Sequence, residues 1–187
     1  NREILIGLIV IGVDPSSTST GYGLIEYDSK KVRYIDCGCI RPKARMKFED
    51  RLVYIFDQFS QVLDQYKPSE SAVESTFFGK DADSAAKLGQ ARGVLLLALR
   101  KALIPIGHYS PATVKKSIVG SGQASKESVQ FMVSRLLKLE EVPITLDASD
   151  ALGIAMCHTR KLTIATSGKA SKRKPEIEAL LKKMVRR

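Results

Sequence analysis

The chain has 187 residues, 44% of them hydrophobic, and a formal net charge of +10. This length suits one domain with a substantial core. The apolar stretch Ile4 to Val13 is too short to span a bilayer and has no small-residue cleavage site after it, so neither a membrane segment nor a secretory signal is indicated. Cys37, Cys39 and Cys157 lack zinc-site spacing, and we expect reduced thiols in a cytoplasmic protein.

The positive charge is concentrated at the C-terminal end. From Arg160 onward, ten lysines and arginines face two glutamates, a balance of +8, which leaves +2 for the first 159 residues. We therefore predict a compact domain over residues 1–165 and a basic tail over 166–187, with a helix from Glu176 to Met184. The tail suits a polyanion. A solvated tail without a partner is the alternative.

Strands and helices follow one another in the order expected of a mixed sheet. Three apolar segments linked by turns open the chain and predict strands over 9–14, 24–27 and 32–40. The other predicted elements are a helix over 48–66, a strand over 71–74, a helix capped by Asp83 or Ser84 and running towards Arg100, a strand over 103–106, a short helix opened by Ser110 and Pro111, a helix from Ser125, and a small-residue helix from Asp147 to Ala155. This order predicts an α/β fold, with a mixed sheet and helices on both faces.

The first strand ends in an acid. Asp14 follows a β-branched apolar run, and Pro15 holds it in an extended conformation. A side chain at the end of a rigid strand can be aimed accurately. Asp-Pro followed by serines is also ordinary turn chemistry, and for Asp14 alone the turn is the simpler interpretation.

Three further acids favour a functional role for Asp14 over a simple turn. Glu74 ends another apolar strand, and Asp147 and Asp150 share one face of a helix in its first turn, where the helix dipole also favours acids. Four carboxylates at one sheet edge would repel one another unless cations neutralised them. Mg²⁺ prefers oxygen ligands, and two such ions can activate water and stabilise the leaving oxygen of a phosphodiester. The pattern thus suggests metal-dependent hydrolysis.

Several motifs resemble those of one family. In order and spacing, the chain from about residue 9 to 157 resembles the RuvC family of Holliday-junction resolvases. The matching segments are Gly12 to Ser17, Thr20 to Gly23, Val73-Glu74, Lys87 to Gly93 and Asp147 to Leu152. The resemblance implies a ribonuclease-H-like fold and a homodimer that nicks two symmetry-related strands of a four-way DNA junction. It also implies a partnership with the RuvA–RuvB branch-migration complex.

The same resemblance implies roles for individual residues. The expected ligands of Mg²⁺, or of Mn²⁺, with two ions per active site, are Asp14, Glu74, Asp147 and Asp150. Lys115 and Lys126 correspond to lysines near the scissile phosphate, and a fixed cation there can stabilise the charge that develops. Phe77, or its neighbour Phe78, corresponds to an aromatic residue that stacks on junction bases. Arg92 is expected to contact backbone phosphate or to support the dimer.

Three other functions compete with this one. A junction-binding scaffold without catalysis would bind and not cut. A ribonuclease-H-like nuclease for RNA or for RNA–DNA hybrids would share the fold and the metal site. An actin-like kinase is suggested by the first hairpin alone, but the chain lacks the length and the second phosphate hairpin of that fold. Substrate comparison separates these possibilities.

Overall fold

The chain folds around one five-stranded sheet. The computed structural model describes residues 7–28, 31–75, 81–139 and 142–167. In it the strand order is β3-β2-β1-β4-β5. The antiparallel strands are β1 (Leu8–Asp14), β2 (Thr20–Tyr27) and β3 (Val32–Ile40), whereas β4 (Glu70–Glu74) and β5 (Ile106–Tyr109) run parallel to β1. The predicted mixed α/β sheet is confirmed.

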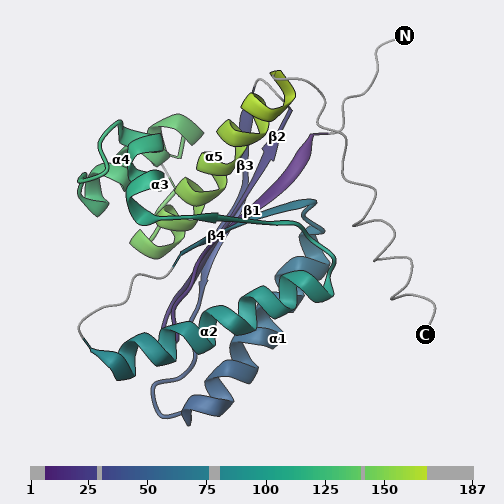
Figure 1. Cartoon of the computed structure of the whole chain (residues 1–187), viewed down its shortest axis with the longest axis vertical. Helices are drawn as coiled ribbons and strands as arrows, with labels where there is room; N and C mark the ends of the chain where they lie inside the picture. Colours follow the sequence, from purple (N-terminus) through teal and green to yellow (C-terminus); the bar gives the residue numbers. More distant parts are fainter. Residues whose placement is uncertain (1–6, 29–30, 76–80, 140–141, 168–187) are drawn as a thin grey trace, which may run out of the picture.

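Helices cover both faces of this sheet (Figure 1). One face packs against α1 (Phe48–Tyr66) and α2 (Ala82–Lys101); the other packs against α3 (Pro111–Val119), α4 (Lys126–Leu137) and α5 (Leu146–Ser167). Alternate residues of a strand point to opposite faces. In β1, for example, Ile11 and Val13 enter the core beneath α1 and α2, whereas Val10 enters the core beneath α3 to α5.

Helix α5 lies unusually close to the sheet, because glycines line its path. A Cβ atom added to Gly12 of β1 would lie 2.0 Å from the carbonyl oxygen of Ala151, and one added to Gly21 of β2 would lie 2.2 Å from that of Asp147. Only glycine permits such an approach. The small-residue helix predicted from Asp147 therefore packs as expected, with its first turn beside the strand end that carries Asp14.

Some predicted boundaries were wrong. Strand β5 begins at Ile106 rather than 103, because Leu103 adopts a left-handed conformation with φ of 60° as the chain leaves α2. Asp81, not Asp83 or Ser84, caps α2, accepting hydrogen bonds from the amides of both. Strand β2 begins at Thr20, four residues before the predicted start, and α5 continues to Ser167. The caps at Ser110 and Ser125 are confirmed.

Two predictions fall outside the described residues. These are the stacking aromatic, Phe77 or Phe78, and the part of the predicted tail (166–187) that follows α5, with its helix. Within the part of the chain that the structure describes, no helix is long and apolar enough to cross a membrane.

Candidate active site

Two acids end adjacent parallel strands at the same edge of the sheet. Val13 of β1 is paired with Val73 of β4, so Asp14 and Glu74, each one residue further on, emerge side by side. Both residues are half-buried. Their placement follows from register alone: the apolar runs define the two strands, and each run stops at its acid.

The other two acids reach this edge from α5. Asp14 pairs across β1 and β2 with Gly21, and the backbone of Asp147 rests directly against Gly21. Asp150 lies three residues further along and therefore on the same side of the helix. Thr145 accepts a hydrogen bond from the amide of Ala148 at 3.3 Å and so caps this first turn. The strand ends and the helix start thus bring the four acids to one place.

Burial and mutual repulsion make these acids hard to ionise. Burial, followed by the charges of Glu74 and Asp150, raises the pKa of Asp14 to about 7. Burial and the charge of Asp150 likewise raise the pKa of Glu74 to about 7. In both cases the charge of Lys126 opposes the rise. The edge is therefore a place where a cation would be strongly favoured.

Two lysines supply part of that missing positive charge. The ammonium of Lys126, the first residue of α4, forms an ion pair with Asp150 at 2.9 Å. This bond raises the pKa of Lys126. Lys115 is half-buried on α3, and its charge lowers the pKa of Glu74, whereas its neighbour Lys116 is exposed. The two lysines that were singled out from the sequence therefore both face the acids.

Ser19 holds Asp147 and is itself held by Arg41, and neither contact was predicted from the sequence. The hydroxyl of Ser19, in the turn between β1 and β2, donates a 2.6 Å hydrogen bond to Asp147. Arg41, which follows β3, in turn donates to the Ser19 hydroxyl at 3.2 Å. Ser19 lies in a run of serines and threonines in which Ser16 accepts hydrogen bonds from the amides of Thr18 and Ser19. That bonding is the hydrogen-bonded turn expected of such residues.

Arg92 lies close to this edge but is already engaged. Its guanidinium donates to the backbone carbonyl of Glu74 at 3.1 Å and lies 2.9 Å from Nδ1 of His108. Burial and the charge of Arg92 lower the pKa of His108. These contacts tie α2 to the end of β4, and contact of Arg92 with DNA or with a second subunit stays a prediction. His158, the other histidine, is buried against the hydroxyl of Tyr109 at 2.8 Å.

The chemistry of the donor set fits a hard divalent cation. All four acids offer oxygen ligands. The nearby lysines do not supply enough positive charge to balance the four carboxylates. Among the described residues, no three carboxylate, imidazole or thiol groups are gathered tightly enough to hold one ion as they stand. Like charges repel one another at this edge, and Asp150 is paired with Lys126. A bound cation would have to draw the side chains together.

Comparisons with known proteins agree on one family. The family model described as "Crossover junction endodeoxyribonuclease RuvC" matches residues 10–158. A protein of that name from a Shewanella species is 46% identical over 167 residues, 88% of this chain and 95% of its own. Another, from Aeromonas hydrophila, is 44% identical over 165 residues, 87% of this chain and 94% of its own.

A solved structure is similar over the same region. It is described as Thermus thermophilus RuvC in complex with Holliday junction substrate. The two chains superpose with a TM-score of 0.78 and 32% sequence identity, covering 85% of this chain and 97% of the other. The family model, the relatives and the solved structure thus agree with one another.

Proposed function

Because this chain belongs to the RuvC family of crossover junction endodeoxyribonucleases, we propose that it resolves four-way DNA junctions by paired symmetric nicks in recombination and repair. The observation that carries the proposal is the meeting of Asp14 and Glu74 with the first turn of α5 at one sheet edge. The junction complex of the similar Thermus protein supports the same substrate. We also propose that the chain works in the cytoplasm, with its described cysteines reduced.

The proposed ligands of the metal are Asp14, Glu74, Asp147 and Asp150. We propose Mg²⁺ as the cofactor, with Mn²⁺ as a substitute and two ions per site; when bound, they would activate a water and stabilise the leaving oxygen. Asp14 and Glu74 hold their positions on rigid strands, so the attack on the phosphodiester is oriented by the sheet. The raised pKa values of both acids are consistent with a site built for added positive charge.

We propose that Lys126 and Lys115 act on the scissile phosphate. Without metal, Lys126 balances the acids through its ion pair with Asp150, in which the lysine side chain is 53% accessible and the aspartate side chain 17%. A cation that neutralises Asp150 would free this ammonium to turn towards the phosphate. A fixed positive charge at that point stabilises the charge developing on the phosphoryl oxygens.

Cleavage of a four-way junction is the first test of the proposed function. A synthetic four-way junction with Mg²⁺ should receive paired nicks at symmetric positions, whereas linear duplex and RNA–DNA hybrid controls should stay uncut. Equal or better cutting of a control would move the activity to another ribonuclease-H-like substrate. Tight junction binding without cutting in any divalent metal would favour a non-catalytic scaffold.

Helix α2 offers a surface for the proposed homodimer. One side of this helix carries Gly89, Gly93 and Leu97, spaced every four residues. A Cβ atom added to either glycine would meet nothing within 4 Å, and Leu97 is 55% exposed. Small residues let a second helix approach closely, and a two-fold dimer matches a two-fold junction.

Leu97→Arg should therefore weaken the dimer by about tenfold or more, because it places an unpaired charge in an apolar helix contact. Light scattering over a dilution series measures the dissociation constant. Phe131→Arg, an equally exposed apolar position on α4 at 61%, serves as the matched control. A dimer of unchanged affinity in Leu97→Arg would contradict this interface.

The Ser19 hydroxyl should matter for metal affinity. Ser19→Ala removes the donor that orients Asp147 and leaves Arg41 without its acceptor. We expect the Mg²⁺ concentration for half-maximal cleavage to rise about tenfold, as for other residues that orient a ligand, with metal-free junction binding unchanged. Ser60→Ala, the same change on α1, should leave the metal requirement as it is. An unaltered Mg²⁺ titration of Ser19→Ala would show that Asp147 needs no such support.

The remaining predictions rest on the resemblance and on charge. We propose that Phe77 stacks on junction bases, that the basic tail adds salt-sensitive affinity for DNA, and that the chain works with a RuvA–RuvB complex. We propose that Arg92 supports cleavage in two ways: it holds the end of β4 through the carbonyl of Glu74, and it contacts the DNA.

A further inference from the structure

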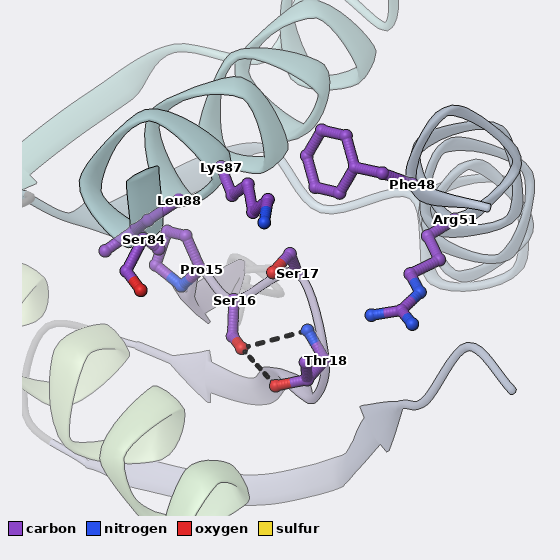
Figure 2. A pocket seen from close by; sticks show the side chains of 9 residues that line it. All are labelled: Pro15, Ser16, Ser17, Thr18, Phe48, Arg51, Ser84, Lys87 and Leu88. Carbon is purple, nitrogen blue, oxygen red and sulfur yellow. Dashed lines mark hydrogen bonds between the residues drawn. The ribbon is translucent and has the colours of Figure 1, made fainter. Parts of the chain in front are cut away.

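A hollow of about 600 Å³ opens between the starts of α1 and α2 (Figure 2). Its floor is the turn that follows Asp14, and its walls are the first turns of α1 and α2. The volume lies within the range of small-molecule sites, which is about 300–1,000 Å³. The hollow is separate from the four acids, none of which lines it.

The lining combines one aromatic ring with cations and hydroxyls. Figure 2 shows Phe48 of α1 and Lys87 of α2 reaching towards the turn that carries Ser17 and Thr18, with Arg51 beside them. None of the lining residues is acidic. An aromatic face binds a nucleobase by stacking, and lysine with hydroxyl groups binds phosphate.

The two cations differ in how free they are to bind. Arg51 donates to the backbone carbonyls of Met46 and Ala44, at 3.0 and 2.6 Å, and so fixes the segment before α1. Among the described residues, Lys87 forms an ion pair with Asp83 alone, at 2.5 Å, and the two side chains are 46% and 72% accessible. Exposed pairs of this kind contribute little to stability, so Lys87 can exchange Asp83 for a phosphate at small cost.

Position along the chain links the hollow to the substrate. Pro15, in its floor, directly follows Asp14, and consecutive Cα atoms lie about 3.8 Å apart. Successive phosphates of one DNA strand are spaced by a similar few ångströms along the helix axis. A strand whose scissile phosphate lies at Asp14 and that continues over Pro15 would reach the hollow within one or two nucleotides.

We propose that the hollow is a nucleotide subsite, which holds one nucleotide flanking the scissile phosphate of the junction strand. Its base stacks on Phe48, and its phosphate is held by Lys87 and the hydroxyls of Ser17 and Thr18. This inference rests on the proposed nuclease function and deepens it: phosphate contact sets the position of the strand, and the stacked base contributes to the choice of cutting site.

Photocrosslinking tests the stacked base directly. Junctions carry 5-iodouracil at single positions within two nucleotides of the cut, on either side, and are irradiated with the full-length protein in EDTA so that no cleavage intervenes. We expect a crosslink at Phe48 from one of these positions, located by peptide mass spectrometry. The crosslink should disappear in Phe48→Leu, which keeps apolar bulk and removes the ring, and persist in Phe131→Ala, the exposed aromatic control on α4.

Two further measurements test the base preference of cleavage and the contact of Lys87 with phosphate. With Mg²⁺, Phe48→Leu should flatten the dependence of cleavage on the base at the crosslinked position, reducing a preference of several-fold towards unity. Lys87→Gln should lower the slope of log binding constant against log salt by about 1, as expected for one lost phosphate contact, whereas the exposed Lys116→Gln should change it less.

The outcomes separate this inference from the proposed function. If the wild type neither binds nor cuts junctions, both fail together. If the wild type cuts junctions but no crosslink forms at Phe48 and Phe48→Leu keeps the wild-type cleavage pattern, the subsite is refuted while the nuclease stands. An unchanged salt slope in Lys87→Gln would remove the phosphate contact from the proposal.

Discussion

Asp14→Asn should lower the rate of junction cleavage by about 1,000-fold or more, with junction affinity kept within about threefold of the wild type. Asparagine has nearly the shape of aspartate but lacks the charge that a divalent cation needs. Asp14 ends the central strand β1 and is the acid whose pKa responds to all three of the others, so it lies at the electrostatic centre of the group. The measurement is single-turnover cleavage with Mg²⁺, alongside binding in EDTA.

The matched control is Asp57→Asn, which makes the same chemical change at an exposed position of α1. It should cut at the wild-type rate. Normal cutting by Asp14→Asn would show that the catalytic centre lies elsewhere. Loss of binding together with cleavage would assign Asp14 a structural role, because removing a negative charge favours contact with a polyanion unless the fold is disturbed.

Much of this site could be predicted because its parts are local. An apolar run that stops at an acid places that acid at a strand end, and Asp14 and Glu74 needed no more than this. The separation of Asp147 from Asp150 sets their shared helix face. The strand register and two glycines bring the strand ends and α5 together. Gly12 and Gly21 were noted as parts of the motifs, but the close approach of α5 that requires them was not evident.

What escaped prediction depends on contacts between distant segments. Ser19 and Asp147 are 128 residues apart, and nothing in a serine-rich turn reveals which hydroxyl will meet a carboxylate. The engagement of Arg92 with the carbonyl of Glu74 depends on how α2 crosses the sheet. The strand β5 was misplaced because Leu103, an apolar residue suited to a strand, instead takes a left-handed conformation at the end of α2. Tertiary packing decided each of these cases.

The charge of the acids should also make metal-free stability depend on pH. Asp14 holds its proton more tightly in the folded chain, where its pKa is about 7, than in the unfolded chain, where it is near 3.8. Between these values the folded state binds more protons, so the free energy of unfolding decreases as pH rises from about 4 to about 7 and levels off above that. Asp14→Asn cannot lose a proton there. In EDTA the variant should therefore become progressively more stable than the wild type across this range, by several degrees in Tm at pH 8.

Divalent metal should reverse this difference. A cation that binds only the folded state adds stability in proportion to the logarithm of its concentration above Kd. We expect about 10 mM Mg²⁺, enough to occupy a weak carboxylate site, to raise the Tm of the wild type at pH 8. At pH 5, where protons occupy the carboxylates, the rise should be much smaller. Asp14→Asn should respond weakly at both values, and NaCl of matched ionic strength should reproduce none of the shift. Only a site that includes Asp14 links metal binding to the proton that Asp14 releases. If Mg²⁺ raised the Tm of the wild type and of Asp14→Asn equally, the cation would bind away from this sheet edge.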